Sequence, residues 1–177
     1  MRRNESTIRY IKHIIVWSAL LLYLGVAAVV QGTDLTWPQV LKEVRQKYPD
    51  VTQLSGAQLD SWLSSSKRSA PVLLDARTSD EYNVSNLKGA HRALSKEEAL
   101  KVLAKAPKDR SVVVYCSVGY RSSKLASQLQ KSGFTKVYNL EGGIFAWKNA
   151  GRTVYKNNQP TSAVHPYSKE WGVLLNR

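Results

Sequence analysis

The sequence predicts an α/β fold in which helices flank both faces of a mainly parallel central sheet. Short runs of β-branched and aromatic residues alternate with segments whose apolar residues recur every three or four positions. The run Val112–Tyr115 is apolar at every position. Such a run is typical of a strand that is covered on both faces in the middle of a parallel sheet.

The N-terminal region has the features of a membrane-directing segment. Residues 14–30 are apolar or weakly polar, and they follow four basic residues, Arg2, Arg3, Arg9 and Lys12. This run reaches the lower limit for a helix that spans a bilayer. We expect residues 1–32 to form an uncleaved hydrophobic anchor helix, with the domain on the extracytoplasmic, periplasmic side. The alternative is a signal peptide that is cleaved near residues 26–28, which would release a secreted protein.

Between residue 33 and the middle of the chain, capping-box patterns predict the first residues of two helices. Residues 33–51 combine a polar spacer with an amphipathic helix that ends before Pro49, and a short strand follows over 51–54. The pattern from Ser55 to Gln58 predicts the start of a helix. After a strand over 72–76, the pattern from Thr78 to Glu81 predicts a second, short helix.

The second half continues the alternation of strands and helices. Residues 89–93 indicate a very short strand or turn, and Ser95 to Glu98 form a third capping-box pattern ahead of a helix that Pro107 ends. The expected elements that follow are a strand at 112–115, a helix from 122 to 131, a strand at 136–140 and a helix around 144–147. Residues 152–177 show no clear periodicity before 167–175, which predicts either a docking helix or a loose tail.

Composition excludes several kinds of site. The chain has a net charge of +13, but its Lys and Arg residues are scattered and no nucleic-acid motif is present, so we expect no nucleic-acid partner. The single cysteine excludes an internal disulfide, and the three histidines are too far apart in sequence to suggest a metal site. We therefore expect no cofactor and no metal, while the oligomeric state is not predicted.

The single cysteine, Cys116, lies between the predicted central strand and a helix. A helix N-terminus and a curl of unpaired backbone N–H groups stabilise an anion, and they lower the pKa of a thiol. Gly119 permits a positive φ or a close approach to a ligand, and Arg121 adds a positive charge. Asp75, Cys116 and Glu141 all lie near the carboxyl ends of predicted strands, where ligands bind in such sheets, so we expect them at the same rim. The alternative for Cys116 is a buried cysteine that only packs.

Four segments together resemble the rhodanese, or sulfurtransferase, family. They are Leu74–Arg77 with Glu81 and Tyr82 following, Leu87–Ala90, Cys116–Ser122 and Leu140–Trp147. The resemblance covers residues 52–151 and implies a rhodanese-like three-layer fold. Asn86 departs from the family pattern, because many relatives have histidine there.

The resemblance implies that Cys116 is a nucleophile that holds a persulfide. It would take sulfur from a small anionic donor such as thiosulfate and pass it to cyanide or a thiol. The active loop would comprise Ser117, Val118, Gly119 and Tyr120, which contribute backbone N–H groups, Arg121, which helps to bind the anionic donor, and Ser122, where the helix begins.

Supporting roles are expected for three residues near this loop. We expect Asp75 to hydrogen-bond to the loop, and Arg77 to pair with Glu81 in the first turn of the following helix. The alternative for Arg121 is a structural role, in which it pairs with Asp75 or Glu141 across the rim.

Two other functions remain open. Cysteine phosphatases and arsenate reductases of similar fold also use a loop from cysteine to arginine, but theirs is one residue longer, and Tyr115 stands where those phosphatases usually have histidine. The other alternative is a non-catalytic sulfur-carrying or redox-sensing module.

Overall fold

The computed structural model describes residues 35–176. The membrane-directing segment predicted over 14–30 lies outside these residues. Within the described part of the chain, no helix has the length and apolar character that crossing a membrane requires.

A parallel five-stranded sheet forms the centre of the fold and confirms the predicted class. Its strand order is β1-β5-β4-β2-β3, with every neighbouring pair parallel. The strands are β1 (Thr52–Leu54), β2 (Val72–Asp75), β3 (His91–Arg92), β4 (Val112–Tyr115) and β5 (Val137–Leu140). The sequence placed β4 in the middle because it is apolar throughout, and β4 is indeed the central strand.

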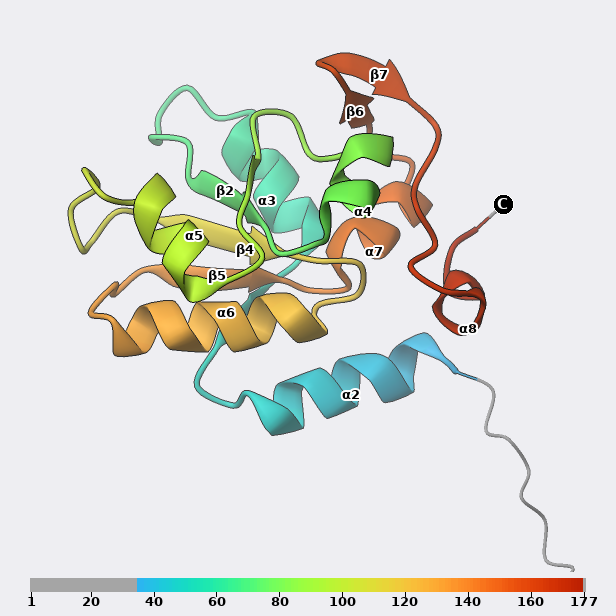
Figure 1. The fold of residues 1–177 in the computed structure, drawn as a ribbon, viewed down its shortest axis with the longest axis horizontal. Coiled ribbons are helices and arrows are strands. Elements are labelled where there is room, and N and C mark those ends of the chain that lie inside the picture. The colour runs from blue at the N-terminus through green and yellow to red at the C-terminus, as the bar shows by residue number, and fades with distance from the viewer. Residues whose placement is uncertain (1–34, 177) are drawn as a thin grey trace, which may run out of the picture. The chain divides into compact units, whose positions relative to one another are not determined.

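Helices cover both faces of this sheet (Figure 1). Helices α5 (Lys96–Val102) and α6 (Tyr120–Lys131) lie on one side, and α3 (Gly56–Leu63), α4 (Ser79–Val84) and α7 (Gly143–Asn149) lie on the other. Helix α2 (Trp37–Lys47) precedes β1. Alternate side chains of β4 enter the two resulting cores, with Val112 and Val114 in one and Val113 and Tyr115 in the other. The central strand is therefore buried on both faces.

The helix starts follow the capping patterns with one exception. Ser55 with Gln58 and Thr78 with Glu81 form complete capping boxes. Ser95 caps α5 by accepting the N–H of Glu98, but the Glu98 carboxylate accepts the N–H of Leu94 instead. The third box is therefore half formed.

The C-terminal segment is folded onto the domain. It contains an antiparallel hairpin of β6 (Val154–Lys156) and β7 (Gln159–Thr161), followed by the short helix α8 (Lys169–Gly172). Leu174 is buried, and its carbonyl accepts a hydrogen bond of 2.7 Å from the side-chain amide of Asn149 on α7. The docking alternative for this tail is the one observed, and the hairpin was not predicted.

Candidate active site

Cys116 follows the carboxyl end of β4 directly, and Gly119 precedes α6. The cysteine is buried, with 1% of its surface exposed. Its Sγ atom accepts hydrogen bonds from the backbone N–H of Gly119 at 3.2 Å and from Oγ of Ser122 at 3.4 Å. Gly119 reaches this position with a φ of 109°, a conformation that favours glycine.

These contacts favour the thiolate form of Cys116. Burial raises the pKa of this thiol, but the positive charge of Arg121 and the hydrogen bonds from Ser122 and Gly119 outweigh burial and bring the pKa below its ordinary value. The first N–H groups of α6 add to the same field, because they have no acceptor within the helix. The environment of the buried Sγ therefore favours the thiolate over the thiol.

The first turn of α7 holds the outer side of the loop. The backbone N–H groups of Ile144 and Phe145 donate to the carbonyl oxygens of Cys116 and Ser117 at 2.9 and 3.1 Å. In a trans peptide the N–H points opposite to the C=O, so the N–H groups of Ser117 and Val118 point away from α7. Gly143 has a φ of 56°, and a Cβ at this position would overlap the Cys116 carbonyl oxygen.

The buried carboxylate of Glu81, which we expected to pair with Arg77, instead ties Arg121 to the loop. Both terminal nitrogens of Arg121 donate to the two oxygens of Glu81 at 2.7 Å, and Oγ of Ser117 donates to Glu81 at 2.7 Å. Burial raises the pKa of Glu81, but the hydrogen bonds from Arg121 and Ser117 and the charge of Arg121 lower it to about 2. Glu81 therefore stays ionised at neutral pH and fixes the position of Arg121.

Asp75 and Arg77 form a separate buried pair. The Asp75 carboxylate accepts bonds from the Arg77 guanidinium at 2.8 and 2.6 Å and from its backbone N–H at 3.1 Å. Arg77 also donates to the carbonyl of Ser85, and both charged side chains are fully buried. Two expectations are thus corrected: Arg77 pairs with Asp75 rather than Glu81, and Asp75 supports the segment around α4 rather than the active loop.

Glu141 lies next to the turn that contacts the active loop, but its carboxylate pairs with a residue of α2. Its carboxylate forms an ion pair with Arg45 at 2.6 Å. The same helix reaches the active loop through its C-terminal end, where Tyr48 packs edge-on against Tyr120 and the Nζ of Lys47 lies 4.8 Å from the centre of the Tyr120 ring. Helix α2 therefore belongs to the rim of the site.

Comparison with known proteins assigns this arrangement to a family. A family model described as the rhodanese-like domain matches residues 57–150, more than half of the 177-residue chain. The chain belongs to the rhodanese-like domain family. The thiosulfate sulfurtransferase GlpE of Coxiella burnetii is 34% identical over 93 residues, which cover 52% of this chain and 84% of that protein.

Other relatives share only part of their length with this rhodanese-like domain. A Mycobacterium tuberculosis protein named as adenylyltransferase/sulfurtransferase MoeZ is 36% identical over 91 residues, which cover 51% of this chain and 23% of that protein. A solved rhodanese-like domain from Anabaena has 27% identity and a TM-score of 0.52, with 60% of this chain and 80% of that chain covered. The relatives named as sulfurtransferases are thus similar to this chain at modest identity, and MoeZ over only 23% of its own length.

Tyr167 is a residue of the site that the sequence did not reveal. Its ring centre lies 4.7 Å from the Arg121 guanidinium carbon. Tyr167 has a φ of 64°, which is rare for an aromatic residue, and its N–H donates to Nδ1 of His165 at 3.0 Å. The C-terminal segment of this rhodanese-like domain therefore places an aromatic ring over the charge that lowers the thiol pKa.

Removal of this ring is expected to raise the pKa of Cys116. In a Tyr167→Ala variant, water reaches the face of Arg121 and screens its charge. The lost cation–π contact contributes about 0.5–1 kcal/mol, which sets the upper limit of the effect on the thiolate. This corresponds to an increase of less than about one pH unit. The pH midpoint of Cys116 alkylation by iodoacetamide measures it, and Tyr167→Phe serves as the control that keeps the ring. Identical midpoints in all three proteins would show that the ring has no electrostatic role.

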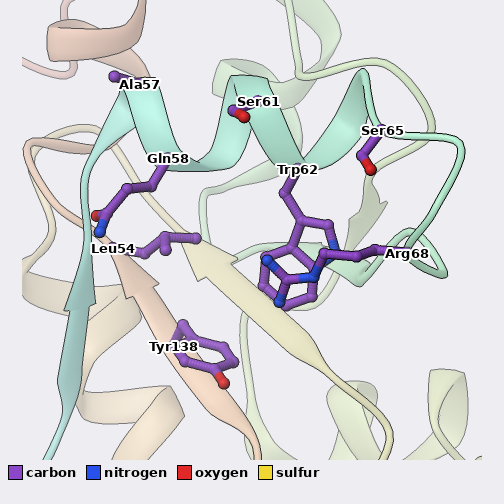
Figure 2. Close-up of a pocket in the computed structure, with 8 residues that line it drawn as sticks. All are labelled: Leu54, Ala57, Gln58, Ser61, Trp62, Ser65, Arg68 and Tyr138. Atoms are coloured by element: carbon purple, nitrogen blue, oxygen red, sulfur yellow. The ribbon is translucent and has the colours of Figure 1, made fainter.

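A separate hollow lies where α3 crosses β1 and β5 (Figure 2). It has a volume of about 490 Å³, and Figure 2 shows the Arg68 side chain beside the Trp62 ring, with 4.0 Å from the guanidinium carbon to the ring centre. No residue of the loop Cys116–Ser122 lines this hollow, so we assign it no part in the chemistry of Cys116.

Proposed function

We propose that this rhodanese-like domain is a sulfurtransferase that carries sulfane sulfur as a persulfide on Cys116. The observation that supports this most directly is the environment of Sγ, which accepts hydrogen bonds from Gly119 and Ser122 while the charge of Arg121 lowers the thiol pKa. A thiolate at the start of a helix is a nucleophile that needs no neighbouring base.

The first half of the reaction takes sulfur from a small anionic donor, for which we propose thiosulfate. The Cys116 thiolate attacks the outer sulfur, a bond forms from Sγ to that sulfur, and the sulfur–sulfur bond of thiosulfate breaks. Its electron pair leaves with sulfite. The new terminal sulfur is an anion, and the unpaired N–H groups at the start of α6 stabilise it.

The second half passes this sulfur to an acceptor, either cyanide or a thiolate. The acceptor attacks the terminal sulfur, the bond to Sγ breaks, and its electron pair restores the Cys116 thiolate. The products are thiocyanate from cyanide or a persulfide from a thiol. The cycle closes without an outside oxidant or reductant.

The donor preference rests on charge and on one relative. The side chain of Arg121 is 29% exposed, so its positive charge reaches the solvent beside the buried thiol. GlpE, the relative for which the match covers 84% of the length, is named as a thiosulfate sulfurtransferase. We include neither nucleic acid nor a cofactor in the proposed reaction.

Turnover with thiosulfate and cyanide tests the proposed function. The full chain is expected to produce thiocyanate and sulfite in equal amounts, and to leave a phosphate monoester such as p-nitrophenyl phosphate intact. A single release of sulfite without thiocyanate would indicate a sulfur carrier that does not turn over. Hydrolysis of the phosphate ester without sulfite release would indicate a phosphatase and contradict the proposal.

We also propose that the N-terminal segment anchors the protein in a membrane, with the domain on the periplasmic side. The support is the apolar run over 14–30 and the basic residues that precede it. The protein is expected to remain in the membrane pellet after washing with alkaline carbonate. Its release with a shortened N-terminus would instead show a cleaved signal peptide.

A further inference from the structure

A recess lies beside Arg121, between the start of α5 and the outer face of α6. It has a volume of about 320 Å³, and its lining includes Leu94, Lys96, Glu97, Arg121, Lys124 and Gln128. Figure 1 shows α5 and α6 as neighbours on the same side of the sheet. A recess of this size holds a small organic molecule.

One end of the recess meets the active loop. Arg121 lines the recess and also donates to Oγ of Ser117 at 3.0 Å. From Arg121 the recess follows one face of α6 through Lys124 to Gln128, because residues three and seven positions apart share a helix face. At the helical rise per residue this path is about 10 Å long.

Positive charge exceeds negative charge in the lining of the recess. Among residues 35–176, neither Lys96 nor Lys124 has a carboxylate within ion-pair distance. Glu97 is the acidic residue of the lining. Hydrogen bonds from its own backbone and from Ser95, together with the charge of the neighbouring Lys96, lower its pKa, so it contributes one negative charge against the positive charges of Lys96 and Lys124. Leu94, which is 46% exposed, adds an apolar wall. Two ammonium groups beside an apolar surface match a molecule with carboxylates on a short carbon chain.

We propose that this recess binds the sulfur acceptor, and that the acceptor is a thiol with one or more carboxylates a few bonds from its sulfur. The carboxylates contact Lys96 and Lys124, and the thiol sulfur lies at the Arg121 end, next to the persulfide. The inference rests on the proposed function, because it requires a persulfide on Cys116.

The transfer step balances without a further reactant. The acceptor thiolate attacks the terminal sulfur of the persulfide, and a new sulfur–sulfur bond forms on the acceptor. The bond between Sγ and the terminal sulfur breaks, and its electron pair stays on Sγ. The acceptor leaves as a persulfide.

Two acceptors and two double variants of the full chain test the inference. Mercaptosuccinate carries two carboxylates and 2-mercaptoethanol carries none, and sulfite release from thiosulfate reports turnover with each. The test variant is Lys96→Gln with Lys124→Gln. The control is Lys101→Gln with Lys105→Gln, which removes the same charge from exposed residues outside the recess lining.

Loss of the two recess lysines is expected to raise the KM for mercaptosuccinate about five- to tenfold, since each contact with a surface charge contributes up to about 1 kcal/mol. The KM for 2-mercaptoethanol and the single-turnover rate of persulfide formation are expected to stay within about twofold of wild type, and the control variant is expected to behave as wild type.

An equal change for both acceptors, an equal change in the control variant, or no change at all would overturn the inference while the proposed function stands. Failure of the wild-type protein to form a persulfide would overturn both. Slower persulfide formation in the test variant, with an unchanged KM for both acceptors, would show that these lysines bind the donor. That result would also overturn the inference.

Discussion

Replacement of Cys116 with serine is expected to abolish sulfur transfer, with a loss of roughly three orders of magnitude or more in turnover. The chain has one cysteine, so no other thiol can take over the reaction. The pKa of a serine hydroxyl is far higher than that of a thiol. The charge of Arg121 and the two hydrogen-bond donors that act on Sγ are therefore not enough to ionise serine at this position. Thiocyanate formation from thiosulfate and cyanide measures the loss.

The size and polarity of serine make this a conservative test of the nucleophile. Ser122 and Gly119 can still donate to the new oxygen, so the loop is expected to keep its structure. Unchanged circular dichroism and thermal unfolding provide the control. Turnover by a folded Cys116→Ser protein at more than a few per cent of wild type would mean that another group transfers the sulfur.

Replacement of Gly143 with alanine is expected to disturb the active loop from outside. Gly143 has a positive φ, which costs an alanine about 1–2 kcal/mol, and the added Cβ overlaps the backbone oxygens of Cys116 and Ser117. The overlap is with backbone, so no side chain can rotate away. Overpacking of this kind costs about 1–3 kcal/mol, and displacement of the loop by about 1 Å is expected to reduce turnover about a hundredfold.

Gly151 offers a matched control for this prediction. It also has a positive φ, of 74°, but a Cβ there meets no atom within 4 Å. Gly151→Ala therefore has the backbone strain without the overlap, and it is expected to lose about 1–2 kcal/mol of unfolding free energy while it keeps near-normal turnover. Equal turnover in the two alanine variants would show that contact between α7 and the loop does not matter for the reaction.

The local patterns that the sequence carries predicted most of the central fold. Val112–Tyr115 is buried on both faces because β4 lies in the middle of the sheet. The apolar run that indicates this position can be seen in four consecutive residues, without knowledge of the rest of the chain. The boxes that begin at Ser55 and Thr78 are likewise contained within four consecutive residues. The β6–β7 hairpin also had a local signal, since Asn157 and Asn158 both adopt the positive φ of its tight turn.

The ion pairs of the site could not be predicted in the same way. Glu81 has a complete local explanation as the third residue of a capping box, yet the same carboxylate also binds Arg121, which lies far along the chain. From the sequence we expected Glu81 to pair with Arg77, four residues away. Only the packing of α4 against the loop shows that Arg77 turns to Asp75 and leaves Glu81 to Arg121. Tyr167 had no local signal, because its role depends on how the tail docks.

The mass of the Cys116 peptide after exposure of the full chain to thiosulfate alone is the most direct test of the proposed chemistry. The peptide is expected to gain the mass of one sulfur atom, one sulfite is expected to be released per chain, and cyanide is expected to remove the added sulfur as thiocyanate. An unmodified Cys116 peptide, or sulfite release without sulfur on Cys116, would contradict a persulfide carried at the start of α6.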